Sequence, residues 1–136
     1  MIVLDEQVRA DQRLLLARWG VPFRQIGKDV APKGIKDDNI IPFLFTLKSP
    51  TLFTHDHGFF QPRLVHRRYC LVLIAEKDIE AALYIRRFLI HPRFDTNAQR
   101  MGTVARVHHE GISFWEQRNR RLERAAWPGE SGSPDA

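Results

Sequence analysis

Residues 1–6 read MIVLDE and residues 51–57 read TLFTHDH, and these two stretches decide the fold. In each of them an apolar run typical of a β-strand leads directly into an acidic residue, Asp5 in the first and Asp56 in the second. Because the carboxyl ends of parallel strands meet at one edge of a sheet, we expect both side chains there. Open α/β folds bind their ligands at that edge.

A second acidic position, Asp37-Asp38, stands between these strands in the sequence, at the start of a predicted helix. Carboxylates from three distant segments that converge on one edge repel each other and are held together by a cation. Mg²⁺ takes one or two direct carboxylates and keeps several waters, so three acids suffice to hold it. A metal-dependent hydrolase is therefore the first hypothesis.

The remaining apolar pattern predicts alternating strands and helices. The predicted strands are 1–5, 23–26, 51–54, 69–74, 103–107 and 112–115. The predicted helices are 8–19, 37–45, 77–90 and 116–126. Pro42 lies inside the second helix and is expected to delay or kink it. This alternation predicts an α/β fold in three layers, with a mainly parallel central sheet between helices.

The bulk properties fit one domain. The 136 residues are 43% hydrophobic and 27% charged, with a net charge of +5. We expect a single domain over residues 1–127 that ends in a basic helix, followed by a disordered tail at 128–136. The sequence lacks a run of the roughly 20 apolar residues that a membrane helix needs, and no leader is recognised, so the expected location is the cytoplasm. Cys70, the single cysteine, lies in an apolar run and is expected to be buried and inert.

Three segments resemble the PIN-like domain superfamily, in particular the small PIN-like proteins grouped with VapC-type toxins. Residues 2–6 (IVLDE) are similar to the family's strand that ends in Asp-Glu. Residues 36–40 (KDDNI) are similar to its acidic helix start, and residues 54–59 (THDHGF) to its Thr-x-Asp-x-Asp-Phe signature. The order and spacing agree over roughly residues 1–75.

This resemblance implies a Rossmann-like α/β/α sandwich with a Mg²⁺ or Mn²⁺ site. It also implies endoribonuclease activity, as the toxin of a toxin–antitoxin pair. On the matching positions, Asp5, Asp37 and Asp56 are the expected catalytic metal ligands, and Glu6 and Asp38 are adjacent candidates. The expected partners are an RNA substrate, an antitoxin protein and a second copy of the chain, with no membrane.

The signature is not fully kept. Gly58 stands where the family has its second acid, and Gln7 replaces the usual Asn. His57 could take the place of that acid as a ligand suited to Mn²⁺ or carry a proton. Thr54 is expected to orient a carboxylate or a metal-bound water. The loss of one acid equally fits a weakened relative that binds RNA or a protein without cleaving.

Arginines follow the acidic segment directly. Arg63, Arg67 and Arg68 are expected to hold RNA phosphates, because a guanidinium bonds phosphate oxygens with two N–H groups, although a solvated loop explains them about as well. A further basic group falls on the predicted last helix: Arg118, Arg120, Arg121 and Arg124. It could extend the RNA surface, receive an acidic antitoxin segment, or simply face solvent.

Two further interpretations use the same segment. His55-x-His57 has the residue type for zinc, but the sequence supplies no third ligand nearby. A receiver-type phosphoacceptor domain also gathers aspartates at strand ends, and it needs a lysine on a late strand end, for which Lys77 is the candidate.

Overall fold

The computed structural model describes residues 1–29 and 37–129, except for the side chains of Asp37 and Arg120. Most of the predicted tail at 128–136 therefore falls outside the described residues, as do residues 30–36. The strands are β1 (Ile2–Leu4), β2 (Arg24–Gln25), β3 (Thr51–Thr54), β4 (Cys70–Ile74), β5 (Thr103–His108), β6 (Gly111–Glu116) and β7 (Asn119–Ala125). The α-helices are α1 (Ala10–Arg18), α2 (Asp37–Leu44), α3 (Ala81–Ile90) and α4 (Asn97–Arg100), and the short 3₁₀ helices are η1 (His57–Phe59), η2 (Pro62–Leu64) and η3 (Asp78–Glu80).

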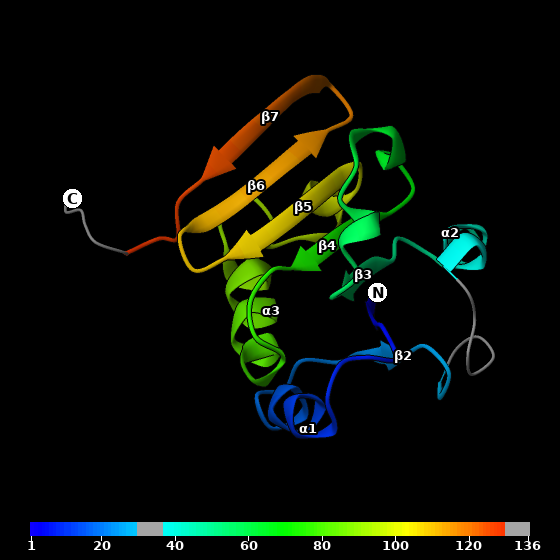
Figure 1. The fold of residues 1–136 in the computed structure, drawn as a ribbon, viewed down its shortest axis with the longest axis vertical. Coiled ribbons are helices and arrows are strands. Elements are labelled where there is room, and N and C mark those ends of the chain that lie inside the picture. Colours follow the sequence, from blue (N-terminus) through cyan, green and yellow to red (C-terminus); the bar gives the residue numbers. More distant parts are fainter. Residues whose placement is uncertain (30–36, 130–136) are drawn as a thin grey trace.

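The strands form one seven-stranded sheet in the order β2-β1-β3-β4-β5-β6-β7 (Figure 1). Strands β1 to β5 are parallel, whereas β6 and β7 add an antiparallel hairpin at one end. The predicted α/β class with a mainly parallel sheet is confirmed. Chain order reverses between β1 and β3, because β2 lies on one side of β1 and β3 on the other. Such a switch point is where open α/β sheets form their ligand crevice.

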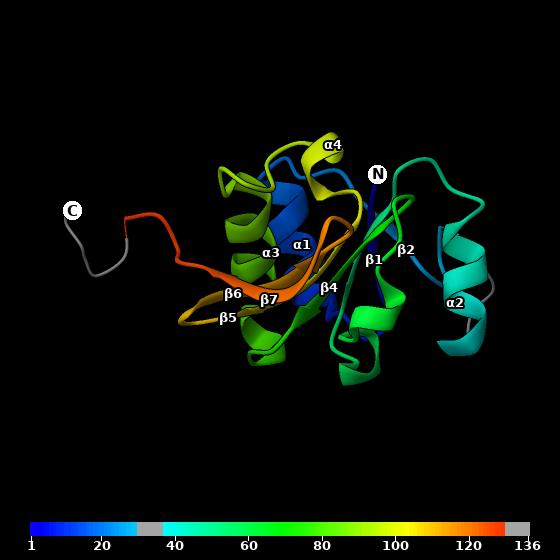
Figure 2. The same ribbon diagram turned by 90° about the horizontal axis from the view of Figure 1, so that it is seen from above.

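Alternating side chains of the strands divide the core into two clusters. Ile2, Leu4 and Phe53 pack with the buried sides of α1 and α3. Val3 and Leu52 face the other way and pack with α2 and Phe59, among other residues. Helices therefore lie on both faces of the sheet, as a three-layer arrangement requires, and Figure 2 shows α2 well apart from α1, α3 and α4.

One connection lacks an α-helix. Between β3 and β4 the chain makes only the two short 3₁₀ helices η1 and η2. Phe60 of this connection packs on Trp115 of β6, and among the described residues no α-helix covers the hairpin end of that face (Figure 2).

The predicted C-terminal helix at 116–126 is wrong, because these residues turn at Gln117 and Arg118 and return as β7, antiparallel to β6. The arginines of this segment fit a helical period and a strand period equally well. What decides between them is the pairing partner: the β6 edge offers unpaired backbone groups, and Trp127 just beyond β7 is buried in the core. The Trp127 indole N–H donates to the His108 carbonyl at 2.7 Å, which anchors the end of the strand.

The other predicted elements hold with small shifts of their ends. Pro42 lies within α2, which still runs from Asp37 to Leu44. The helix predicted over 77–90 opens with η3 before continuing as α3. Cys70 is fully buried, as expected. No described helix is both long enough and apolar enough to cross a membrane.

Candidate functional site

Two of the predicted carboxylates, Asp5 and Asp56, lie at the carboxyl edge of the sheet, at its switch point. Strands β1 and β3 pair in parallel with Leu4 beside Phe53. Asp5 follows β1, and its backbone N–H donates to the Phe53 carbonyl at 3.0 Å, so the pairing continues to the acidic residue. Asp5 and Thr54 thus end neighbouring strands on the same side of the sheet.

A chain of hydrogen bonds connects the two predicted aspartates through Thr54. The Thr54 hydroxyl donates to Asp5 Oδ2 at 2.7 Å. It also accepts the backbone N–H of Asp56 at 3.0 Å. Thr54 is fully buried, so its hydroxyl has a fixed position. The sequence prediction that Thr54 orients a carboxylate has a direct counterpart in these contacts.

Asp56 also caps η1. Its Oδ1 accepts the backbone N–H of Gly58 at 2.8 Å. A Cβ atom at position 58 would lie 3.1 Å from that same oxygen, tighter than most Cβ contacts. Glycine therefore allows the amide to approach the carboxylate, in the place where the PIN-like signature carries another acid.

Asp38, from the acidic start of α2, lines the same pocket as Asp56. A cavity of about 450 Å³ lies between α2 and the η1–η2 segment, and Asp38, Asp56 and Arg63 contribute to its wall. Apolar side chains such as Ile41 and Phe59 complete it. Asp37 is the first residue of α2, but its side chain lies outside the described part of the chain. The pocket wall therefore carries both charge signs, with Asp38 on α2 and with Asp56 and Arg63 on the η1–η2 segment.

Glu6 lies against the β2–α2 connection. A Cβ atom on Gly27 would come within 2.9 Å of the Glu6 carboxyl carbon. Gly27 also has a φ of +86°, a conformation that residues other than glycine rarely adopt. This glycine therefore gives the Glu6 side chain its space next to the switch point.

The histidines do not form a zinc site. His55 Nδ1 lies 3.2 Å from the Ile74 carbonyl, while His57 is exposed on η1. Because a carbonyl only accepts, Nδ1 donates to it, and the buried Nε2 of His55 has no hydrogen-bond partner in the structure. Sequence reasoning missed this nitrogen, because only the packing against β4 makes it buried.

The three predicted RNA-binding arginines separate in space. Arg63 lines the carboxylate pocket, and its Nε donates to Gln61 at 2.7 Å. Arg68 donates to the Phe45 carbonyl at 3.0 Å and covers the Phe45 ring, which is a packing role. Arg67 is exposed and lies next to Gly102, near the opposite edge of the sheet. Only Arg63 is placed beside the acids.

The β5–β7 end of the sheet has a basic surface away from the carboxylate pocket, which we call the open face. Arg106, Ser113 and Arg124 lie side by side on three successive strands. The acidic residues of these strands turn the other way, where Glu116 and Glu123 lie 3.5 and 3.8 Å from Arg93. Strand alternation thus places Arg106 and Arg124 on one face, and Glu116 and Glu123 on the other. The wrong helix prediction for 116–126 hid this arrangement.

The expected metal ligands are the carboxylates at the carboxyl edge of the sheet. Carboxylate oxygens at a sheet edge have the chemistry for Mg²⁺ or Mn²⁺. Among the side chains described for residues 1–29 and 38–129, however, no three His, Cys, Asp or Glu groups are arranged to hold an ion. The described residues give one linked pair, Asp5 and Asp56, with Asp38 on the wall of the adjoining pocket.

A comparison of the chain with protein-family models, curated proteins and solved structures finds no match. The functional argument therefore depends on the residues and their geometry.

Proposed function

We propose that this chain is a PIN-like, Mg²⁺- or Mn²⁺-dependent endoribonuclease that acts in the cytoplasm as the toxin of a toxin–antitoxin pair. The observation that carries the nuclease proposal is the Asp5–Thr54–Asp56 chain of hydrogen bonds at the switch point, beside a pocket with Asp38 and Arg63. The toxin role comes from the sequence resemblance alone.

In this proposal the acidic groups at the edge hold the metal: Asp5, Asp37 and Asp56, with Glu6 and Asp38 next to them. When bound, the ion makes hydroxide available from water near neutral pH and neutralises charge on the phosphate. Thr54 keeps the Asp5 carboxylate in one orientation through its 2.7 Å hydrogen bond. Arg63, on the same segment as Asp56, would bind the phosphate.

The reaction is hydrolysis of an RNA phosphodiester. Water attacks the phosphorus and the bond to the 3′ oxygen breaks, which leaves a 5′-phosphate and a 3′-hydroxyl that gains a proton. His57, exposed one residue after Asp56, is a candidate for carrying that proton.

The test is cleavage of a labelled, structured RNA pool with Mn²⁺. We expect cleavage by the wild-type protein, and none in EDTA or with the Asp5→Asn/Asp56→Asn double variant. The matched control is Asp11→Asn/Asp95→Asn, which removes the same charge from two exposed positions and should cleave normally. Equal cleavage by both double variants would point to a contaminating nuclease and reject the site.

A second candidate function is a PIN-like module that binds RNA without cleaving it. It is favoured by Gly58 in place of an acid and by the absence of a three-ligand group among the described side chains. In that case well-folded protein binds RNA in EDTA, does not cleave it, and shows no Mn²⁺ binding that depends on Asp5 and Asp56.

Both candidate functions would use the open face to bind RNA. We expect Arg106→Gln/Arg124→Gln to weaken RNA binding in EDTA and to reduce the slope of log K against log salt by up to about two. Arg18→Gln/Arg86→Gln removes the same charge from the helices on the other face and is the control. If both pairs weaken binding equally, net charge and not this surface is responsible.

A further inference from the structure

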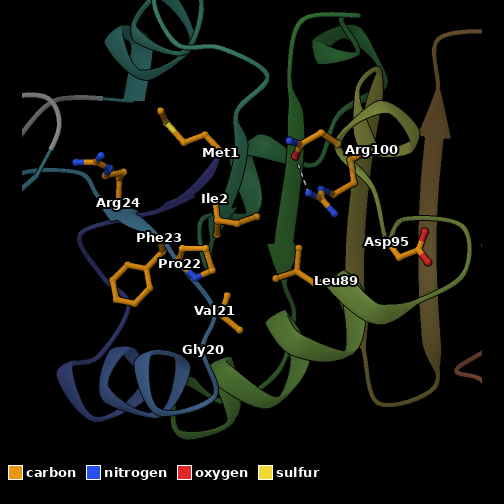
Figure 3. Close-up of a pocket in the computed structure, with 11 residues that line it drawn as sticks. Met1, Ile2, Gly20, Val21, Pro22, Phe23, Arg24, Leu89, Asp95 and Arg100 are labelled. Atoms are coloured by element: carbon orange, nitrogen blue, oxygen red, sulfur yellow. Dashed lines mark hydrogen bonds between the residues drawn. The ribbon is translucent and has the colours of Figure 1, made fainter.

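A separate pocket lies at the amino edge of the sheet, at the opposite end of β1 and β3 from the carboxylates. Its volume is about 470 Å³, within the range of small-molecule sites. The α1–β2 connection contributes Val21, Pro22 and Phe23, and the end of α3 contributes Leu89. Figure 3 shows these side chains around the space that the Arg100 guanidinium also lines.

Arg100 is a buried charge held only by neutral groups. The residue is 6% exposed. Its Nε donates to Thr51 Oγ1 at 3.2 Å, Nη1 to the Phe94 carbonyl at 2.7 Å and Nη2 to Asn97 Oδ1 at 2.7 Å. A guanidinium has five N–H groups, so one on each terminal nitrogen is not used by these bonds.

No carboxylate within residues 1–29 and 38–129 forms an ion pair with Arg100. Asp95 lines the same pocket, but Figure 3 shows its carboxylate directed away from the guanidinium. Burial lowers the pKa of Arg100, which is the effect of a charge removed from water, and the nearby charge of Asp95 offsets this only in part. Buried charges in proteins are otherwise paired, so this one has room for a counterion from outside the chain.

We propose that this pocket binds a small organic anion. Its carboxylate or phosphate head would accept the two remaining N–H groups of Arg100, and its apolar body would pack on Phe23 and Leu89. Arg24, on the pocket rim, adds a second positive charge. The site is at the amino edge, whereas the proposed nuclease centre is at the carboxyl edge, so the two sites are occupied independently.

The test is isothermal titration with two anions that share one apolar body, benzoate and phenyl phosphate, and with uncharged benzyl alcohol. We expect one or both anions to bind saturably, more tightly than about 10 mM, and the alcohol not to bind. The better anion identifies the head group. Failure of both anions to bind, or equal binding of the alcohol, would overturn the proposal.

Asn97→Asp gives the decisive variant. The new carboxylate has the same shape as the Asn97 side chain and already faces Arg100 Nη2, so it supplies the counterion from within and keeps the fold. We expect it to weaken anion binding at least about tenfold. The control Asp95→Asn removes a charge that points away, and it should bind as tightly as wild type or slightly more so. Unchanged affinity in Asn97→Asp would exclude Arg100 as the binding group.

The Asp5→Asn/Asp56→Asn variant separates this proposal from the nuclease. It should bind the anion like wild type, whether or not the wild-type protein cleaves RNA. Loss of anion binding in this variant would place the anion at the carboxylate site and reject the amino-edge pocket.

Discussion

Replacing Thr54 with valine tests the hydrogen bonds that connect the two aspartates. Valine has nearly the same shape but no hydroxyl, and position 54 is fully buried. The variant loses a 2.7 Å bond to the Asp5 carboxylate and leaves the Asp56 N–H without its 3.0 Å acceptor. A bond to a charged group contributes about 1.5–3 kcal/mol, and a buried group without a partner costs about 1–3 kcal/mol. Because these terms overlap, we expect the free energy of unfolding to fall by about 2–4 kcal/mol.

The assay is urea unfolding followed by circular dichroism and tryptophan fluorescence. Thr54→Ser is the matched control, since it keeps the hydroxyl and removes one methyl group, at a cost of about 1 kcal/mol. A double-mutant cycle with Asp5→Ala isolates the Thr54–Asp5 pair, for which we expect a coupling energy of about 1.5–3 kcal/mol.

Two outcomes would refute the reasoning. If Thr54→Val and Asp5→Ala are additive to within about 0.5 kcal/mol, the hydroxyl does not hold the carboxylate. If Thr54→Ser is as unstable as Thr54→Val, packing of the methyl group is the cause.

If Asp5 also binds metal, loss of its orienting partner should lower Mn²⁺ affinity about 10–100-fold in the valine variant only.

Three further predictions follow from single contacts. Burial raises the pKa of Cys70 to about 12, so the native thiol should not react with a disulfide reagent at neutral pH but should react once unfolded in urea; rapid native reaction would contradict its burial. The hydrogen bond to Glu76 raises the pKa of His109, so this pair stabilises the fold at pH below the ordinary histidine pKa and loses that effect as pH rises through the raised value. Glu76→Gln should return the NMR titration midpoint of His109 toward the ordinary value, and an unchanged midpoint would exclude the pair. Gly58→Asp places a second carboxylate next to Asp56, where its Cβ would lie 3.1 Å from Oδ1, so it should lower the melting temperature without metal and raise Mn²⁺ affinity; an unchanged affinity would argue against a metal at this edge.

The first half of the fold could be predicted because its signals are local. The apolar runs at β1, β3 and β4 are short, are bounded by polar or turn residues, and have no competing helical period. The positions of Asp5, Thr54 and Asp56 at one edge then follow from parallel pairing alone. Their hydrogen-bonded connection could not be predicted, since it depends on which side of the sheet each side chain leaves the strand.

The last strand could not be predicted for a different reason. Its sequence, NRRLERA, satisfies a helix as well as a strand, and the choice is made by the free edge of β6 and by the burial of Trp127. The same error hid the open face, because Arg106 lies beside Ser113 and Arg124 only once β7 is paired. The pairing of a strand with its neighbour in the sheet cannot be recognised from the residues of that strand alone.

The connection between β3 and β4 runs from Asp56 to the turn of the β6–β7 hairpin. Arg63, in η2 of this connection, lines the carboxylate pocket and also a second cavity of about 540 Å³, which Trp115 and Asn119 of the hairpin complete. The Trp115 ring packs on Phe60 with ring centroids 4.5 Å apart, so its position is fixed. An RNA strand that crosses Arg63 could therefore contact the acids with one phosphate and the hairpin with its neighbours. If Arg63 and the hairpin bind RNA without the aspartates, RNA affinity in EDTA should survive Asp5→Asn/Asp56→Asn and fall on Arg63→Gln. The opposite pattern would mean that the acids, through a bound ion, are the RNA site, and that the hairpin takes no part in it.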